Sequence, residues 1–318
     1  MCKPSTQSGF LIVTDDHHST MSMRKQPIQT VGFIGTGIMG LPMAKHLAAA
    51  GFKVTAYNRS SSKAAVLTQY GVNVVESAAK AASGNDAVVV MLSSGPVCDD
   101  ILFSKPNGAV WQMKPGSILI VMSSIPVGTA KAHAELAASA GIQYLDAPVS
   151  GGEVGAIAAN LSIMVGGDND TVASCQQLLQ AMGRTIHIGP IGTGQLTKLA
   201  NQLIVASTIV TVAESLLLAE RGGAQIDKVR DALLGGFASS RILELHGKRM
   251  IDENFRPGGT ATNQVKDTQA ALELAESLEL KLPMLSLTDA LFRNLIDHGH
   301  GDLDHSALIL ELRRLNRL

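Results

Sequence analysis

The sequence predicts an α/β fold, in which a doubly wound, mainly parallel Rossmann-type sheet is followed by an all-helical domain. From Val31 to about Pro190, short apolar runs alternate with Ala-rich helical stretches. This alternation is typical of buried parallel strands joined by helical crossovers. After Gly194 the strand pattern stops, and the remaining segments carry apolar residues at helical spacing. The two halves of the chain are therefore expected to fold differently.

The first apolar run, Val31 to Ile34, predicts a buried strand and leads into the pattern G-x-G-x-x-G at Gly35, Gly37 and Gly40. Gly35 allows a tight turn, Gly37 allows a pyrophosphate to approach the backbone, and Gly40 allows the next helix to pack closely on the strand. The helix N-terminus supplies free N–H groups and a positive dipole end. Because a second strand, Lys53 to Tyr57, follows, the context favours a dinucleotide site over an ordinary tight turn.

The other predicted strands are Asn73–Val75, Ala87–Leu92, Ile118–Met122, Gln143–Asp146, Leu161–Val165 and Thr185–Ile188. Helical stretches such as Pro126 to Ala140 and Asn169 to Met182 lie between most of them. The spacing is short between Gln143 and Val165, where no room is left for long crossovers. The later strands are therefore not expected to be all parallel.

The long segment from Gln195 to Arg221 contains no Gly or Pro and predicts one helix of 27 residues, about 40 Å long. Shorter helices are predicted after it, at Asp227–Leu234, Arg241–Asp252, Thr262–Leu278, Pro283–Asp297 and His305–Leu315. We predict a tail (1–26), a dinucleotide-binding domain (27–191), an interdomain helix (192–222) and an all-helical domain for substrate binding and dimerisation (223–318).

Composition excludes several classes of protein. The 318 residues are 46% hydrophobic and 17% charged, which indicates about two globular domains. The net charge of −1 gives no electrostatic case for nucleic acid or an anionic membrane, and apolar runs such as Ala87 to Leu92 are too short to span a bilayer. Three scattered cysteines fit a reducing cytoplasm and argue against disulfides and zinc. The tail, with His17 and His18, is expected to be mobile, without metal or a targeting signal.

The end of the second strand, Tyr57 to Ser60, bears on the choice of nicotinamide cofactor. In NAD sites an acid about 20 residues after the glycine motif usually binds the ribose 2′-OH. Here Asn58 and Arg59 stand at that place. Arg59 can pair with a 2′-phosphate, and Asn58 and Ser60 can donate hydrogen bonds, so NADP is expected. NAD, with Arg59 merely solvated, is the alternative.

Two further segments are candidates for substrate chemistry. Asp146 to Gly152 reads DAPVSGG, and the backbone N–H groups of its Ser-Gly-Gly end could hold a carboxylate. Gly192 to Gln202 reads GTGQLTKLANQ and opens the long helix. Lys198 and Asn201 are three residues apart and share a helix face. A Lys–Asn face near the domain junction is a candidate catalytic site, and a surface lysine is the alternative.

Four segments together resemble the β-hydroxyacid dehydrogenase family, and the resemblance covers Gln29 to the C-terminus. They are GFIGTGIMGLPMAKHL, DAPVSGGEVGAIAANLSIMVGGD, GTGQLTKLANQ and VKD at Val265–Asp267. The resemblance implies reversible NADP-dependent hydride transfer to a small semialdehyde. The segments DENFRPG and DHSAL are most similar to those of members that reduce tartronate semialdehyde (2-hydroxy-3-oxopropanoate) to D-glycerate. Alternative substrates are 3-hydroxyisobutyrate, threonate, glyoxylate and succinic semialdehyde, and a non-catalytic NADP-binding module is the alternative of another class.

The resemblance also implies residue roles. Lys198 would donate the proton in reduction, and Asn201 would hold the substrate. In the oxidative direction Lys198 must act as a neutral amine, so burial or a nearby cation should lower its pKa. Further substrate contacts are implied for Ser123, Ser150, Gly151 and Gly152. Cofactor contacts are implied for Gly35, Thr36, Gly37, Ile38, Met39, Gly40, Asn58, Arg59, Ser60, Leu92, Ser93, Ser124 and Lys266. No metal is expected, and a homodimer or homotetramer is expected through the C-terminal domain.

A few positions depart from the family pattern. Val121 stands where many relatives have Asp, Ser93 where they often have Pro, and Ser124 where Thr is commoner. These positions flank the cofactor loops and bear on details of cofactor contact. Thr268 replaces a usual Leu and bears only on packing. His305 either caps the site of a two-fold partner or is satisfied locally at a helix start.

Overall fold

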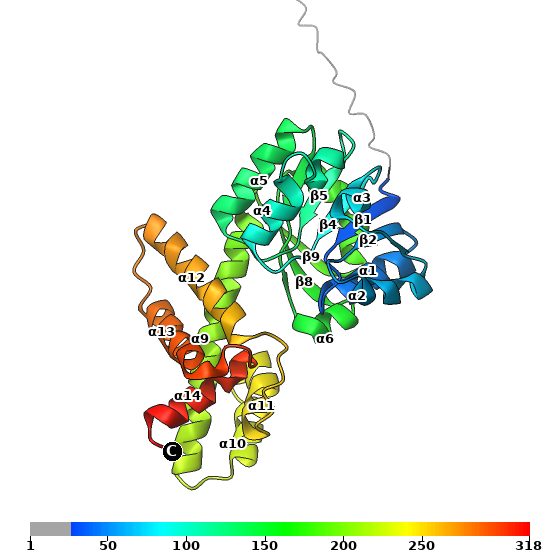
Figure 1. Ribbon diagram of the computed structural model, residues 1–318. Coiled ribbons are helices and arrows are strands. Elements are labelled where there is room, and N and C mark those ends of the chain that lie inside the picture. Colours follow the sequence, from blue (N-terminus) through cyan, green and yellow to red (C-terminus); the bar gives the residue numbers. More distant parts are fainter. Residues whose placement is uncertain (1–26) are drawn as a thin grey trace, which may run out of the picture.

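The computed structural model describes residues 27–318 and has a nine-stranded sheet followed by a helical region (Figure 1). The sheet and its helices occupy the first part of the chain, and the helical region begins with one long helix. The predicted fold class is confirmed. The predicted tail, with its histidine pair, lies outside the described residues.

The sheet follows the order β3-β2-β1-β4-β5-β6-β8-β7, with β9 beside β8. Strands β1 to β6 are parallel in the order 3-2-1-4-5-6 of dinucleotide-binding sheets. As the spacing suggested, the later strands are mixed: β8 is antiparallel to β6 and β7 and parallel to β9. The bounds are β1 Thr30–Ile34, β2 Lys53–Tyr57, β3 Asn73–Val74, β4 Ala87–Val90, β5 Ile118–Val121, β6 Gln143–Asp146, β7 Val149–Ser150, β8 Leu161–Gly166 and β9 Gly183–Gly189.

Both faces of the sheet are covered, which explains why its central strands are almost purely apolar. Every residue of β4 and β5 is buried. Along β4, Ala87 and Val89 face one core cluster, and Val88 and Val90 face the other. The helices around the sheet are α1 Gly40–Ala49, α2 Ser61–Ala65, η1 Val66–Tyr70, α3 Ala78–Ala82, α4 Gly95–Phe103, η2 Ala109–Gln112, α5 Val127–Ser139, α6 Gly152–Ile157, α7 Asn169–Ser174 and α8 Gln176–Gln180.

Several helix starts are fixed by side-chain caps. Ser77 accepts a hydrogen bond from the N–H of Lys80 at the start of α3, and Asp168 accepts one from the N–H of Thr171 at the start of α7. Such caps satisfy N–H groups that have no partner within the helix. The helix predicted over Asn169–Met182 is divided at Cys175 into α7 and α8, so that prediction is corrected.

The helical region is built around α9, Thr193–Arg221, which has 29 residues and starts two residues before the predicted helix. In the view of Figure 1, α12 and α13 lie on one side of α9, and α10 and α11 lie on the other. The other elements are α10 Ile226–Leu234, the π-helical η3 Leu243–Gly247, α11 Lys248–Ile251, α12 Ala261–Ser277, α13 Pro283–Leu295, the π-helical η4 Ile296–His300, the 3₁₀ turn η5 His305–Ala307 and α14 Leu308–Leu315.

Residues of α9 form the centre of the C-terminal core. Ile209, Ala213 and Leu216 are at most 1% exposed and pack with Phe292 of α13 and Leu308 of α14. By length and composition alone, α9 is long and apolar enough to cross a membrane. The expectation from the short apolar runs, that they cannot span a bilayer, therefore does not cover α9. Core packing accounts for part of its apolar character, since 44% of its apolar window is buried.

Candidate active site

The glycine turn after β1 has the shape that the motif predicts. Gly35 has a φ of +100°, and a Cβ on it would lie 2.3 Å from the carbonyl oxygen of Met91. A Cβ on Gly40 would lie 1.9 Å from the carbonyl oxygen of Gly35, so this helix start requires glycine. At Gly37 no atom lies within 4 Å of a Cβ position. The turn therefore leaves open space at the residue where a phosphate would approach the backbone.

Of the residues after β2, Asn58 is held by hydrogen bonds within the protein and Arg59 is not. Oδ1 of Asn58 accepts a hydrogen bond from the N–H of Thr36 at 3.1 Å, and its Nδ2 donates to the carbonyl oxygen of Ser60 at 3.0 Å. Asn58 thus fixes the glycine turn against this loop. Arg59 is exposed and forms no hydrogen bond or ion pair with the part of the chain that the structure describes. Its cation is therefore available to a phosphate.

Ser123, after β5, ties the cofactor-side loops together. Its side chain is fully buried, and its Oγ accepts a hydrogen bond from the N–H of Leu92 at 2.7 Å. Its carbonyl oxygen accepts one from Nε2 of Gln195, whose Oε1 accepts from the N–H of Ile125. Ser123 therefore connects the loops after β4 and β5 with the start of α9. Its predicted contact with substrate stays a prediction.

Asp146, at the end of β6, anchors the start of α9, and sequence reasoning did not assign it this role. The side chain is fully buried. Its two carboxylate oxygens accept hydrogen bonds from the N–H groups of Gly192 at 2.7 Å and Gln195 at 2.8 Å. Burial raises the pKa of this carboxyl, and those N–H groups oppose the rise. Asp146 fixes the helix start one turn before Lys198.

Lys198 and Asn201 meet at one acceptor. Nζ of Lys198 and Nδ2 of Asn201 each donate to Oε1 of Gln202 at 2.9 Å. Nε2 of Gln202 donates to Oδ2 of Asp267, on α12, at 2.6 Å. Burial lowers the pKa of Lys198, the Asp267 carboxylate opposes this, and the Lys266 ammonium adds to it. The direction is the one that a lysine alternating between proton donor and acceptor requires.

Lys266 connects α12 with the cofactor-side loops. Its Nζ donates to the carbonyl oxygens of Ser93 and Ser124, each at 3.3 Å, and lies 3.3 Å from Oδ1 of Asp267. The loops after β4 and β5 are thereby joined to the helix that contacts Gln202. Residues predicted for the cofactor and for catalysis form one network, although their roles stay predictions.

The Ser-Gly-Gly segment lies where β7 meets α6. Gly151 has a φ of +134°, and a Cβ there would lie 3.2 Å from Cδ2 of Leu161. Gly152 has a φ of +60° and no atom within 4 Å of its Cβ position. Ser150 pairs with Ser162 of β8. The segment therefore has an open side at Gly152, and the predicted carboxylate contact stays a prediction.

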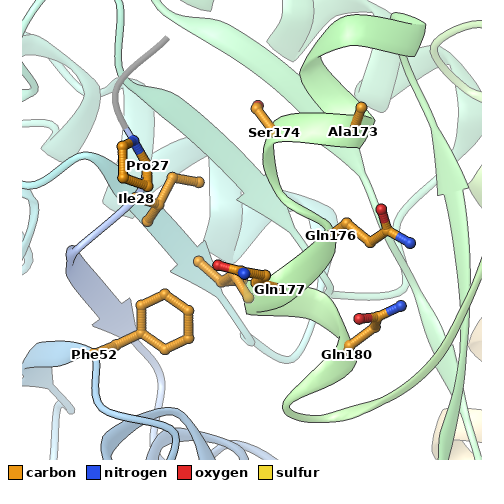
Figure 2. Close-up of a pocket in the computed structure, with 9 residues that line it drawn as sticks. Pro27, Ile28, Phe52, Ala173, Ser174, Gln176, Gln177 and Gln180 are labelled. Carbon is orange, nitrogen blue, oxygen red and sulfur yellow. The ribbon is translucent and has the colours of Figure 1, made fainter. Parts of the chain in front are cut away.

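Two surface cavities lie around the sheet. One, of about 590 Å³, is lined by Thr36, Gly37 and Ile38 of the glycine turn and by residues such as Lys45 and Tyr70. The other, of about 440 Å³, lies between the start of β1, Phe52 and the glutamines of α8 (Figure 2). Phe52 and the start of β1 mark the amino ends of the strands. Since Lys198 and Lys266 connect to the carboxyl ends, the second cavity is separate from the candidate site.

His305 is satisfied by neighbours within the chain. Its Nδ1 lies 3.1 Å from Oε1 of Gln264, and its Nε2 lies 3.3 Å from Nε2 of His246. Burial lowers the pKa of His305 to about 4, and His246 is the next largest cause. The adjacent Asp304 is fully buried and forms an ion pair with Arg249 at 2.6 Å. These contacts support the alternative in which His305 is satisfied locally, at the start of a helix.

His246, Asp304 and His305 offer ligand atoms within 4.8 Å of one another. The carboxylate of Asp304 is, however, already used. It accepts hydrogen bonds from the N–H groups of Gly258 and Ser306 in addition to its ion pair with the Arg249 cation. A guanidinium at this position repels a metal ion, so the cluster is an ion-pair network that joins η5 to the turn before α12.

The fold and the site define an NAD(P)-dependent dehydrogenase with a Rossmann-type domain. Residues 30–192 match the family model described as the NAD binding domain of 6-phosphogluconate dehydrogenase. Residues 192–312 match the model described as NAD-binding of NADP-dependent 3-hydroxyisobutyrate dehydrogenase. The chain belongs to the 3-hydroxyisobutyrate dehydrogenase-like β-hydroxyacid dehydrogenase family.

Known proteins agree with this assignment over nearly the whole chain. The sequence is 42% identical to a 2-hydroxy-3-oxopropionate reductase of Escherichia coli K12, over 91% of this chain and 99% of the relative. The structure is similar to that of a 3-hydroxyisobutyrate dehydrogenase from Salmonella typhimurium, with a TM-score of 0.83, 28% identity and coverage of 89% and 99%. A 3-hydroxyisobutyrate dehydrogenase of Mycobacterium tuberculosis, with L-serine, has a TM-score of 0.79, 31% identity and coverage of 90% and 99%. These likenesses place the chain among NAD(P)-dependent β-hydroxyacid dehydrogenases.

Proposed function

We propose that the protein is an NADP-dependent reductase that converts tartronate semialdehyde to D-glycerate reversibly. The observation that carries the proposal is the network from Lys198 through Gln202 and Asp267 to Lys266, which joins a half-buried lysine to the cofactor-side loops. The 42% identity with the E. coli 2-hydroxy-3-oxopropionate reductase supports the substrate. The motif DHSAL at residues 304–308 supports it as well.

The residues of the glycine turn fit a dinucleotide. Gly37 leaves room for a phosphate, and the first N–H groups of α1 lie directly after it. Arg59, which has no partner within residues 27–318, fits the 2′-phosphate of NADP, and no acid stands beside it to repel that group. When bound, the nicotinamide supplies the hydride. We therefore propose NADP in preference to NAD.

Lys198 would carry the proton chemistry. As an ammonium it can hydrogen-bond the aldehyde oxygen, stabilise the negative charge that develops there and then release its proton to it. In the oxidative direction the neutral amine takes the hydroxyl proton from the substrate. Burial lowers the pKa of Lys198 and so makes the neutral form easier to reach. Asn201, which shares an acceptor with Lys198, would hold the substrate beside it.

The substrate carboxylate is assigned to the Ser-Gly-Gly segment. Gly152 has open space on the side where a side chain would project, so its backbone is accessible to a ligand. Ser150 could donate its hydroxyl to one carboxylate oxygen. A single carboxylate anchor suits a small semialdehyde acid. Ser123 is buried and would act through the loop that it fixes.

We also propose a homodimer or homotetramer formed through the helical region. Large apolar side chains are exposed there, including Ile204 and Leu218 on α9 and Met284 and Leu287 on α13. Clusters of exposed apolar residues mark protein interfaces. Sedimentation velocity on the full chain tests this proposal, and a monomer at about 10 µM would contradict it.

The substrate proposal is tested by NADPH oxidation with a panel of aldehydes. The panel contains tartronate semialdehyde, the semialdehyde from 3-hydroxyisobutyrate, succinic semialdehyde and glyoxylate, and threonate is tested with NADP⁺. We expect the highest kcat/KM with tartronate semialdehyde. A higher kcat/KM for another member of the panel would show that this compound, and not tartronate semialdehyde, is the preferred substrate. The proposed type of reaction would be unchanged. Turnover of none of them, with NADPH still bound, would favour a non-catalytic module.

A further inference from the structure

One side chain, Gln202, connects Lys198 with Asn201 and with Asp267 of α12. Its Oε1 accepts hydrogen bonds from Nζ of Lys198 and Nδ2 of Asn201, each at 2.9 Å. Its Nε2 donates to Oδ2 of Asp267 at 2.6 Å, and Oδ1 of Asp267 lies 3.3 Å from Nζ of Lys266. The amide thus forms the only side-chain hydrogen bond, within residues 27–318, between this part of α9 and α12.

We propose that Gln202 is a positioning residue, which holds Lys198 and Asn201 in a fixed geometry relative to Lys266 and the loops that it contacts. The proposal rests on the proposed function in one respect, namely that Lys198 exchanges the proton. It assigns no contact between Gln202 and the substrate.

The chemistry of the three groups permits only one orientation of the amide. An ammonium can only donate hydrogen bonds, and a carboxylate can only accept them. Oε1 must therefore face Lys198, and Nε2 must face Asp267, as the distances show. Since Gln202 lies four residues after Lys198, the two side chains are neighbours on one face of α9. Asp267 then fixes this face from α12, a helix 65 residues further along the chain.

The electrostatic surroundings make Lys198 sensitive to any change at Gln202. The charged and titratable groups that face Lys198 are Asp267 and Lys266 on α12 and His305 on η5. Gln202 is the neutral group that contacts the ammonium directly. A glutamate at this position would place a carboxylate against the Lys198 ammonium, and also against the Asp267 carboxylate. The carboxylate beside the ammonium raises the pKa of Lys198.

The experiment compares two variants with a charge-matched control. Gln202→Glu keeps the shape and adds a charge, whereas Gln202→Leu removes all three hydrogen bonds. Gln180→Glu makes the same charge change at an exposed residue of α8, around the separate cavity (Figure 2). The first readout is the pH dependence of Lys198 acetylation by acetic anhydride, measured by mass spectrometry on the full chain saturated with NADP⁺. The acetylation rate follows the neutral amine, so its midpoint reports the pKa of Lys198 without any substrate.

We expect the midpoint to rise by about 1 pH unit or more in Gln202→Glu and to be unchanged in Gln180→Glu. In kinetics, the rising limb of the pH profile of kcat/KM for alcohol oxidation should move to higher pH by the same amount. We expect Gln202→Leu to lower kcat about 10- to 100-fold with the Kd for NADPH unchanged. A structural defect alone would lower the whole profile and leave its midpoint in place.

Either of two results would overturn the inference: a midpoint for Gln202→Glu equal to that of wild type, or a kcat for Gln202→Leu within threefold of wild type. Gln202→Glu is isosteric, so it decides the question even if Gln202→Leu does not fold. The acetylation readout also separates this inference from the proposed function. If no aldehyde in the panel is reduced but the midpoint moves, then the proposed function fails and the role of Gln202 stands.

Discussion

The ammonium nitrogen of Lys266, on α12, lies 3.3 Å from the carbonyl oxygen of Ser124, which follows β5 in the sheet region. The two residues are 142 positions apart in the chain. The same nitrogen also contacts the carbonyl oxygen of Ser93 and the carboxylate of Asp267. Lys266 therefore joins α12 of the helical region to the loops predicted to hold the nicotinamide.

Lys266→Met should weaken NADPH binding about 10-fold, because a cation beside the cofactor loops and its hydrogen bonds are lost. Fluorescence titration of NADPH measures the effect. Lys281→Met, at an exposed residue of the same region, is the matched control and should leave the Kd unchanged. An unchanged Kd in Lys266→Met would remove this lysine from the cofactor site.

Arg59→Ala should weaken NADPH binding about 10- to 100-fold and leave NADH binding within about twofold, because only NADPH has the 2′-phosphate. Parallel titrations of the two cofactors check this. Arg59 has no partner within residues 27–318, so its guanidinium is free to bind the 2′-phosphate, and the proposed preference for NADP rests on this. An NADH preference in wild type, or equal losses for both cofactors, would show that Arg59 does not read the phosphate.

Gly152→Ala should raise KM for the semialdehyde several-fold and leave the Kd for NADPH unchanged, because the added methyl group projects into the open space beside the predicted carboxylate site. Gly71→Ala is the matched control, since Gly71 also has a positive φ and open space around its Cβ position. Any cost of the left-handed backbone is common to both variants. If KM is unchanged and NADPH binding weakens instead, the segment belongs to the cofactor site.

His305 should make the protein less stable as the pH falls from about 6.5 to about 4, because its pKa of about 4 lies below the ordinary value of 6.5. In that interval the unfolded chain binds the proton and the folded chain does not, so the free energy of unfolding decreases with falling pH. His305→Asn removes this contribution. Urea unfolding at about pH 7, 6 and 5 should show that the variant's stability deficit becomes smaller toward pH 5, whereas a constant deficit would refute the assignment.

The sequence allowed the fold class to be predicted because parallel strands covered on both faces are almost purely apolar, as β4 and β5 are. The strand β7, Val149–Ser150, was missed because two residues carry no periodicity. The division at Cys175 was missed because both α7 and α8 keep helical spacing across it. Such breaks are set by tertiary packing, which local pattern does not contain.

In the site, Lys198 and Asn201 could be singled out because their spacing places them on one face of an apolar helix. Gln202 could not, since its partner Asp267 is 65 residues away and an amide on a helix has no distinctive pattern. Asp146 had one usable signal, an acid at the end of a buried strand, but its partners at Gly192 and Gln195 come from the fold. Long-range hydrogen bonds of this kind require the structure.

The most direct test of the account is kcat of Lys198→Ala on the best semialdehyde, measured at saturating NADPH together with the Kd for NADPH. Because Lys198 is the half-buried lysine joined to the cofactor-side loops, we predict a kcat about 10²–10⁴-fold below wild type, the range for loss of a positioned proton donor. The Kd for NADPH should stay within about twofold, and Lys198→Arg should restore little activity because a guanidinium does not release its proton. A kcat for Lys198→Ala within threefold of wild type would show that the proton comes from another group and would contradict the account.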